Sequence, residues 1–233
     1  MKASKFCVAA LSLLIASIFA ARGQTPRDKV PVSRQSLCVT EGTVANGEDH
    51  QLTIDDPKVG AYVNAWTSQA VETQFTYFGG TTVESPLGSG EIRRQFGLKL
   101  LAQNACNLVY VMWRFEPGSK IVVSLKKNAG QTASAECGNR GYENIKPIRS
   151  EPVPVVRLGD SHDLNARMQG TELMVAVDGK EVWEGDVGEG GADLKGPVGI
   201  RSDNARLNFN LWAFPLEGLH PQYVRSCQSG AEE

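Results

Sequence analysis

The sequence of 233 residues lacks any excess of positive charge. Its 24 lysines and arginines are opposed by 26 aspartates and glutamates, so the formal net charge is −2. Binding to a nucleic-acid backbone needs clustered lysine and arginine side chains. The charge balance therefore argues against a nucleic-acid partner.

The chain also lacks the short motifs that mark common catalytic and cofactor sites. It contains no Gly-x-Ser-x-Gly elbow, no phosphate-binding loop, no dinucleotide fingerprint and no EF-hand loop. Its three histidines, His50, His162 and His220, lie in polar segments typical of loops. We expect each to be a solvated or capping residue, although Asp160, Ser161 and His162 are neighbours in the sequence.

No apolar run is long enough to cross a bilayer. The longest, Val8–Ala21, has about 14 residues, whereas a spanning helix needs about 20. Lys2 and Lys5 precede this run, and the small residues Ala21 and Gly23 stand three residues and one residue before Gln24, as in a cleaved secretory signal. We therefore predict a signal peptide over residues 1–23 and a secreted or periplasmic protein with no membrane span. Cleavage removes three bases and no acid, which leaves 21 bases, 26 acids and a net charge of −5.

Cleavage also leaves an even number of cysteines, namely Cys38, Cys106, Cys137 and Cys227. In an exported chain such a set indicates disulfides, and four cysteines allow three connectivities. We favour Cys38–Cys227, which would join the ends of the domain, and Cys106–Cys137 on neighbouring strands. A structural zinc site is the rival interpretation, but no pair has the Cys-x₂₋₄-Cys spacing.

Strand-like runs follow a polar, flexible lead-in over residues 24–36, and turn signals separate them. The runs are 59–66, 70–78, 92–102, 107–115, 120–127, 161–168, 172–177, 180–184, 198–201 and 206–214. A looser segment over 133–161 is rich in glycine, proline and charge. Helical periodicity is scarce, so about ten strands predict an all-β fold, a two-sheet antiparallel jelly-roll sandwich, over residues 37–228 as a single domain.

Local patterns add detail to this sandwich. In 107–115 one face carries Val109, Val111, Trp113 and Phe115, which predicts the core side, while Leu108, Tyr110, Met112 and Arg114 face outward. Pro117-Gly118 and Asp178-Gly179 each predict a hairpin turn. Gly196-Pro-Val-Gly199 suits a chain that re-enters a sheet at its edge. Trp183 and Trp212 are predicted to fill the space between the sheets or lie at its rim, as core residues rather than stacking platforms for a sugar ring.

The stretch 164–214 resembles the C-terminal half of concanavalin A-like lectin and glucanase sandwiches, especially their laminin-G-like (LamG-like) and sugar-hydrolase-associated members. The matching residues are Gly170, Leu173, Val175, Val177, Asp178, Gly179 and Val182, followed by Gly196, Pro197, Val198, Gly199, Ile200, Phe209 and Leu211. The resemblance implies a concanavalin A-like sandwich. It does not choose among lectins, glycosidases and adhesion modules.

Retaining glucanases of that superfamily carry Glu-x-Asp-x-x-Glu or a bulged equivalent on one strand. Glu184, Asp186 and Glu189 have this spacing, but the glycines at 185, 188 and 190 do not suit one continuous strand. In the overlapping segment Glu181-Val-Trp-Glu184-Gly-Asp186, the first two acids would point to opposite faces of a strand. We interpret these acids as surface residues of a hairpin with no catalytic role. No catalytic residue is predicted.

A cluster of polar residues around Cys106 and Cys137 is the candidate binding site. Amides, a guanidinium and an aromatic ring suit sugar hydroxyls and sugar faces. The predicted ligand-binding residues are Gln103, Asn104, Asn107, Arg114, Glu136, Asn139, Arg140 and Tyr142. The alternative is a disulfide-stapled loop whose polar side chains satisfy backbone groups. No cofactor or metal is expected, although Ser202-Asp203-Asn204 could ligate calcium as loops of laminin-G-like domains sometimes do.

Three functions remain open at this point. The first is an exported module that recognises a glycan or cell-surface polysaccharide, or another surface, without catalysis. The second is a glycan-cleaving hydrolase, which would need two acids about 5–9.5 Å apart across a cleft. The third is a purely structural domain without a cleft. The sequence favours the first and leaves the oligomeric state open.

Overall fold

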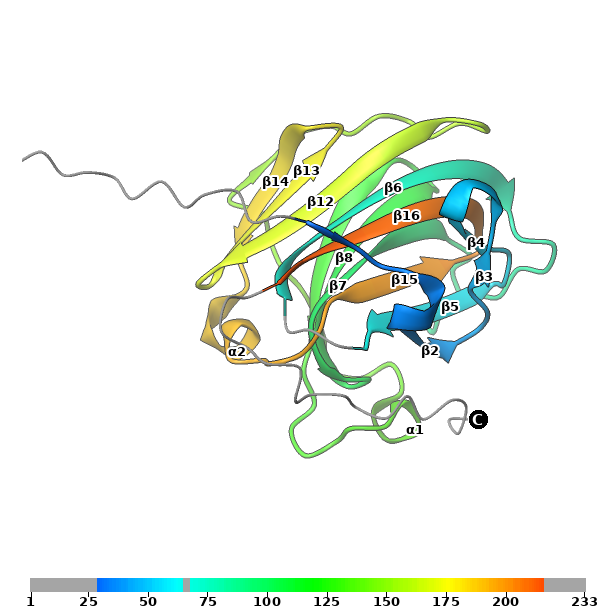
Figure 1. Ribbon diagram of the computed structural model, residues 1–233. Helices are drawn as coiled ribbons and strands as arrows, with labels where there is room; N and C mark the ends of the chain where they lie inside the picture. Colours follow the sequence, from blue (N-terminus) through cyan, green and yellow to red (C-terminus); the bar gives the residue numbers. More distant parts are fainter. Residues whose placement is uncertain (1–28, 65–67, 216–233) are drawn as a thin grey trace, which may run out of the picture.

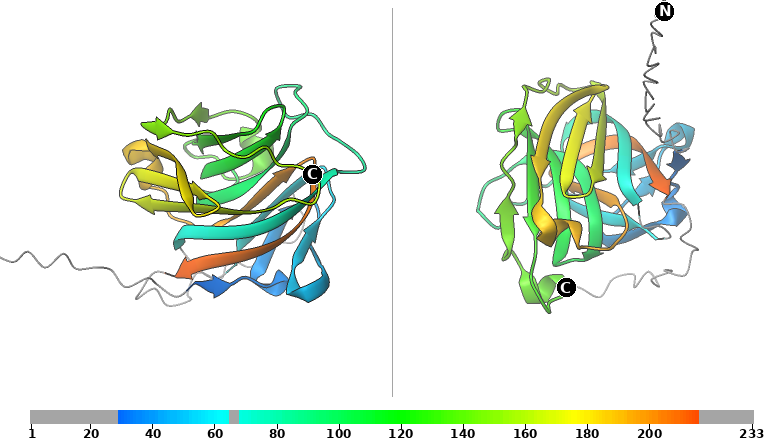
Figure 2. Two further views of the ribbon diagram at one scale, coloured as in Figure 1. Left: turned by 90° about the horizontal axis from the view of Figure 1, so that it is seen from above. Right: turned by 90° about the vertical axis from the view of Figure 1, so that its left-hand side faces the viewer.

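The computed structural model describes residues 29–64 and 68–215, which form two antiparallel sheets packed face to face (Figures 1 and 2). Within these residues one sheet has nine strands and the other has seven. This confirms the all-β, two-sheet antiparallel jelly-roll sandwich predicted from the strand pattern. No helix of the described residues has the length and apolar character needed to cross a membrane.

The nine-stranded sheet has the order β11-β14-β13-β12-β6-β16-β4-β3, with β1 also paired to β16. Its strands are β1 (Val30–Pro31), β3 (Ala45–Asn46), β4 (Leu52–Ile54), β6 (Ser68–Gly80), β11 (Arg149–Ser150), β12 (Ser161–Gln169), β13 (Glu172–Val177), β14 (Lys180–Asp186) and β16 (Ala205–Pro215). The long strands β6, β12 and β16 form its centre.

The seven-stranded sheet has the order β10-β9-β8-β7-β15-β5-β2. Its strands are β2 (Leu37–Glu41), β5 (Lys58–Val63), β7 (Arg94–Asn104), β8 (Asn107–Glu116), β9 (Lys120–Lys126), β10 (Tyr142–Asn144) and β15 (Gly199–Asp203). The helices are short: η1 (Arg34–Ser36), η2 (Glu48–His50), α1 (Ser134–Cys137) and α2 (Gly188–Ala192).

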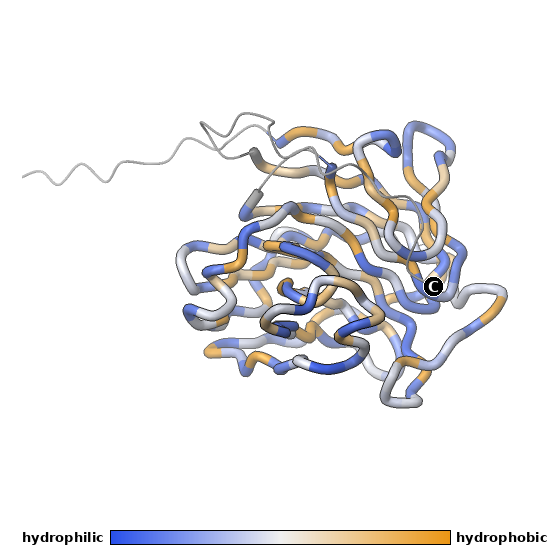
Figure 3. Tube along the Cα trace, turned by 90° about the horizontal axis from the view of Figure 1, so that it is seen from below, coloured by the Kyte–Doolittle hydropathy of each residue, from blue (hydrophilic) through white to orange (hydrophobic). Residues whose placement is uncertain are grey.

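Alternation of apolar and polar residues explains why the two sheets pack together (Figure 3). On β8 the predicted core face is confirmed, because Val109, Val111, Trp113 and Phe115 are all buried between the sheets. Phe75 of β6 meets Trp113 edge-on across the core, with ring centroids 5.6 Å apart. Burial of such rings is the main stabilising contribution to the sandwich.

Both predicted hairpins are present. Asp178 and Gly179 have φ values of +50° and +75°, as a primed turn between β13 and β14 requires. Pro117-Gly118 joins β8 to β9, and Gly118 has a φ of +71°.

The prediction that the chain re-enters a sheet at an edge near Gly196–Gly199 is wrong. β15 begins at Gly199 and lies inside the seven-stranded sheet, between β7 and β5. Pro197 precedes the strand, so its missing N–H costs no ladder bond, and its carbonyl accepts a hydrogen bond from Ala102 N (3.0 Å). Pro197 is therefore compatible with the central strand β15, because it precedes the first residue of that strand.

The N-terminal lead-in differs from its prediction as well. Val30–Pro31 forms β1 beside β16, and Val32 N donates to Leu211 O (2.9 Å). The sandwich therefore begins inside the segment 24–36, because apolar residues between its polar ones pack against the nine-stranded sheet.

Two further placements correct the sequence analysis. Trp183 is buried as predicted, but Trp212 is only half-buried, and the Lys29 ammonium lies 4.5 Å from its ring centroid. His162 is not a solvated loop residue, because it lies on β12 against Trp113 and donates from Nδ1 to Asp178 Oδ2 (2.8 Å). His50 is exposed, and His220 lies outside the described residues.

Candidate functional site

The outward face of the seven-stranded sheet carries a groove of about 1170 Å³, which we call the sheet groove. Its floor is formed by outward-pointing residues of β2, β5, β15, β7, β8, β9 and β10. Its rim includes Leu87, Gly88 and Ser89 of the β6–β7 loop and residues 132–135 and 138–139 of the disulfide loop. The strands thus supply a rigid floor, and two loops supply the border.

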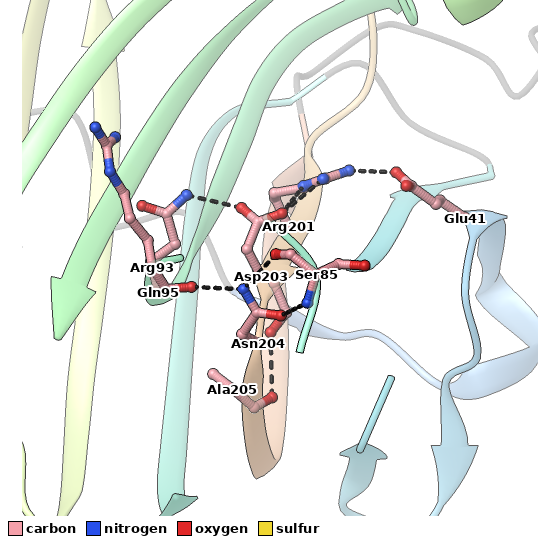
Figure 4. Close-up of polar contacts among 9 residues, drawn as sticks. Glu41, Ser85, Arg93, Gln95, Arg201, Asp203, Asn204 and Ala205 are labelled. Atoms are coloured by element: carbon pink, nitrogen blue, oxygen red, sulfur yellow. Dashed lines mark hydrogen bonds and ion pairs between the residues drawn. The ribbon is translucent and has the colours of Figure 1, made fainter. Parts of the chain in front are cut away.

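A charged network stands at the centre of the floor (Figure 4). Arg201 donates from Nη2 to Asp203 Oδ1 (2.6 Å), and its Nη1 also donates to Glu41. Gln95 Nε2 donates to Asp203 Oδ2 (2.7 Å). Although burial opposes a charge here, the Asp203 and Glu41 carboxylates raise the pKa of Arg201. The network therefore fixes a guanidinium between two carboxylates.

Lys99 lies beside this network and is only 7 % exposed. It faces Tyr110 on β8 and Gly199 on β15, and its ammonium reaches over Gly60 of β5. Within the described residues no hydrogen bond or ion pair joins this ammonium to another group. Burial, followed by the charge of Arg201, lowers the pKa of Lys99 to about 7.

Two tyrosines form an aromatic wall at the other side of the floor. The rings of Tyr110 and Tyr142 stack with centroids 5.9 Å apart and an interplanar angle of 26°. The Lys126 ammonium lies 5.1 Å from the Tyr142 ring centroid, which is cation–π geometry. Tyr142 remains 48 % exposed, so part of its side chain is accessible to a ligand.

Asn204 anchors the β6–β7 loop to the sandwich. Its Nδ2 donates to Ser85 O (2.9 Å) and Arg93 O (3.0 Å), and its Oδ1 accepts from Ser85 N (2.7 Å) (Figure 4). Asn204 has a φ of +53°, a left-handed conformation that asparagine tolerates better than most residues. The side chain therefore holds both ends of the loop that borders the groove.

The disulfide loop forms the opposite part of the rim. Cys106 and Cys137 are bonded (S–S 2.09 Å), which confirms that predicted pair. Cys38 is also disulfide-bonded, but Cys227 lies outside the described residues, so the Cys38–Cys227 pairing stays a prediction. Gly88 of the β6–β7 loop rests on the Asn139 side chain, since a Cβ at Gly88 would stand 1.9 Å from Asn139 Nδ2. The two loops therefore touch.

The structure brings three of the eight predicted binding residues to the groove, namely Asn104, Asn139 and Tyr142. Gln103 is exposed on β7 outside the groove lining. Arg114 points outward near the far end of β8, where Nε donates to Gly118 O (3.2 Å).

The other three predicted residues hydrogen-bond to their own loop. Glu136 accepts from Thr132 N (2.8 Å) and Ala133 N (2.9 Å). Asn107 donates to Gln131 O (2.8 Å), and Arg140 donates to Glu136 O. These contacts correspond to the alternative in which the polar side chains satisfy backbone groups.

Sequence reasoning missed the centre of the groove. Gln95 and Lys99 alternate with the apolar Phe96, Leu98 and Leu100 along β7. This alternation was the sequence pattern that could have identified the two polar residues as outward-facing. Arg201 and Asp203 lie two residues apart and therefore share one face of β15. These four side chains come from segments more than 100 residues apart, and only the central position of β15 brings them together.

The proposed calcium ligands are engaged otherwise. Both Asp203 oxygens accept hydrogen bonds from Gln95 and Arg201, Ser202 Oγ donates to Ala205 O (3.3 Å), and Asn204 holds the loop. Among residues 29–64 and 68–215 no group of three acidic, histidine or cysteine side chains is placed to hold a metal.

The acids of the β14 hairpin lie away from the groove, on the nine-stranded sheet. Glu181 pairs with Arg149, and Glu184 lies 3.5 Å from the same guanidinium. A hydrogen bond with Glu184 is the main cause that raises the pKa of Glu172 on the neighbouring strand. Glu172 is exposed and none of these acids borders the sheet groove.

Comparison with known proteins identifies the fold. No protein-family model matches the sequence, and no curated protein matches it significantly. Among solved structures, the carbohydrate-binding module CBM66 from Bacillus subtilis is 13 % identical, with a TM-score of 0.53 over 75 % of this chain and 91 % of that one. A Bacillus subtilis protein of unknown function with a galectin-like fold is 12 % identical, with a TM-score of 0.52 over 77 % and 88 %. The chain therefore has a galectin-like β-sandwich fold.

Proposed function

We propose that the protein recognises a saccharide in the sheet groove and does not cleave it. The observation that carries this proposal is the half-exposed Tyr142 ring beside hydrogen-bonding side chains on a rigid floor. Aromatic faces pack against the C–H faces of sugars, and amide and hydroxyl groups of residues such as Ser124, Asn139 and Asn144 can pair with sugar hydroxyls. The likeness to a carbohydrate-binding module supports the same function.

The carboxylates of the groove argue against the hydrolase alternative. Glu41 and Asp203 are the two acids among its described lining residues, and both are bound to Arg201. Asp203 is 2 % exposed, and each of its oxygens already accepts a hydrogen bond. A glycosidase needs one carboxyl group free to donate a proton and another free to attack or to activate water. This pair offers neither.

Export by a cleaved signal over residues 1–23, to the periplasm or the exterior, belongs to the same proposal. The Cys106–Cys137 disulfide supports it, because disulfides persist in oxidising compartments. The mass of the protein recovered from its native compartment tests it: a mature chain starting at Gln24 is expected, and a full-length intracellular chain contradicts it. The finer laminin-G-like assignment also stays a prediction.

A glycan array probed with the mature protein, followed by a reducing-end assay on every glycan that binds, tests saccharide recognition. Binding without release of reducing ends is the expected result. Release that disappears in Glu41→Gln would replace the proposal with the hydrolase, whereas no binding to any glycan would remove it.

A further inference from the structure

The lining of the sheet groove is more positive than the rest of the molecule. Five cationic side chains line it, Lys58, Arg93, Lys99, Lys126 and Arg201, against the two acids Glu41 and Asp203. The whole chain carries a net charge of −2. Positive charge is therefore concentrated in the sheet groove.

Three of these cations already have partners. Arg201 is bound by Asp203 and Glu41, and Arg93 pairs with Glu91 (2.5 Å). Lys126 lies over the Tyr142 ring. These cations are positioned by their neighbours and need no ligand to compensate them.

Lys99 differs because it is buried and has no such partner. Its side chain is more than nine-tenths buried, and its ammonium is aimed into the groove over Gly60. A Cβ at Gly60 would stand 2.9 Å from Lys99 Nζ, so the absence of a side chain there makes room for the ammonium. A buried lysine without a counter-ion destabilises a fold. Such a cost is expected where a ligand supplies the missing negative charge.

The surroundings of Lys99 do not neutralise it. The charged and titratable groups around it are Arg201 and Asp203 on β15, Glu41 on β2, Lys126 on β9, Tyr110 on β8, and Lys58 and Tyr62 on β5. The two carboxylates are held by Arg201, whose own charge repels the ammonium. Burial and this repulsion together lower the pKa of Lys99 to about 7, and a bound anion would raise it again.

We propose that the saccharide bound in the sheet groove is acidic, and that its anionic group, the carboxylate of a uronic acid or a sulfate ester, pairs with the Lys99 ammonium. This inference rests on the proposed saccharide-binding function and specifies its ligand class. The anion would lie over Gly60, and the sugar ring that carries it would extend toward the Tyr142 wall across the floor.

Calorimetry with three matched oligosaccharides tests the inference: an oligogalacturonate, its carboxyl-reduced neutral counterpart, and that neutral counterpart carrying sulfate esters. We expect at least one acidic form to bind at least about tenfold more tightly than the neutral form. A preference for the uronate identifies a carboxylate, and a preference for the sulfated form identifies a sulfate. Equal binding of all three overturns the inference while the proposed saccharide binding stands. No binding of any of them, with no hit on the glycan array, removes both.

The variant Lys99→Met tests whether Lys99 causes the preference for the acidic oligosaccharide. The variant should lose the roughly tenfold advantage of the acidic form and keep its affinity for the neutral form within about twofold. Lys146→Met removes the same charge from an exposed position outside the groove and should change nothing. Thermal melts establish that Lys99→Met is folded, as expected when an unpaired buried charge is removed. A folded Lys99→Met that retains the full preference overturns the assignment.

The pH dependence supplies an independent readout. Since only the charged ammonium attracts an anion, affinity for the acidic form should fall above pH 7 in the native protein, by about tenfold in total, and then level off once Lys99 is neutral. Lys99→Met should show no such slope, and neither should the neutral oligosaccharide. A slope of equal size in Lys99→Met contradicts the role of Lys99.

Discussion

The Lys99 ammonium occupies the space above Gly60 that a side chain at residue 60 would otherwise fill. Gly60→Ala therefore displaces the ammonium without removing its charge. We expect affinity for the acidic oligosaccharide to fall several-fold, and affinity for the neutral form to change little. The fold should survive, because the displaced atom is the flexible end of a side chain.

Gly190→Ala is the matched control for this variant. A Cβ at Gly190 would stand 3.0 Å from Lys127 Nζ, so a lysine end is displaced there as well, but outside the groove lining. Calorimetry should find its ligand affinity unchanged. Equal losses in the two variants would show that the effect at Gly60 is not specific to Lys99.

The unliganded protein should become more stable as the pH rises through the range in which Lys99 is neutral in the folded state. Its pKa is about 7 when folded and near 10.5 in the unfolded chain, so between these values the unfolded state binds one more proton. Stability then rises with pH, by at most about 5 kcal/mol over the whole range. Below pH 7 Lys99 is charged in the folded state as well, so the buried charge lowers the free energy of unfolding by its full amount. Urea unfolding of the native protein and Lys99→Met at several pH values measures the difference, and parallel curves for the two proteins would refute it.

Asn204 should be one of the most sensitive polar positions. Asn204→Ala removes three hydrogen bonds to Ser85 and Arg93 and leaves alanine at a φ of +53°. We expect a loss of about 3–5 kcal/mol in the free energy of unfolding, together with weaker ligand binding as the β6–β7 loop loosens. Asn204→Gly tolerates the backbone conformation and should recover about 1 kcal/mol. Equal losses in both variants would assign the whole effect to the hydrogen bonds.

The Cys106–Cys137 disulfide closes a loop between residues 31 apart in the sequence. Replacing both cysteines with alanine should lower the free energy of unfolding by about 3–4 kcal/mol. Because the same loop borders the groove, glycan affinity should fall as well. Thermal melting of the double variant beside the native protein checks this, and equal melting temperatures would contradict it.

Two substitutions at Tyr142 distinguish the contribution of ring stacking to sugar binding from that of the hydroxyl hydrogen bond. Tyr142→Ala removes the exposed ring and should weaken binding of neutral and acidic oligosaccharides alike by about tenfold, which corresponds to about 1.4 kcal/mol. Tyr142→Phe keeps the ring and should bind nearly as well as the native protein. If Tyr142→Phe loses as much affinity as Tyr142→Ala, the hydroxyl rather than the ring contacts the sugar.

The sandwich itself was predictable because long strands leave a period of two in the sequence. β13 and the faces of β8 follow from that pattern, and the Asp178-Gly179 turn fixes the register of its hairpin. Short elements such as β3, β10 and β11 were missed, because two or three residues carry no detectable period. Trp212 was predicted to be a core residue, because the sequence pattern does not distinguish an aromatic residue on the outer face of a strand from one in the core.

The site was predictable only in part. Asn104, Asn139 and Tyr142 line one groove near the Cys106–Cys137 link, which the sequence suggested because a disulfide is a long-range contact. Lys99 and Arg201 could not be paired in this way, because strand pairing between distant segments depends on the fold of the whole chain. Polar alternation marks such residues as outward-facing but does not say which strands become neighbours.

The central position of β15 also determines when the molecule can fold. β7 and β5 flank a strand that is made about 100 residues after β7, and Asn204 reaches back 119 residues to Ser85. Ribosomal synthesis runs from the N-terminus, so the seven-stranded sheet stays split until nearly the whole chain has emerged. High contact order of this kind also slows folding. A nascent chain of this design cannot complete the seven-stranded sheet during most of elongation.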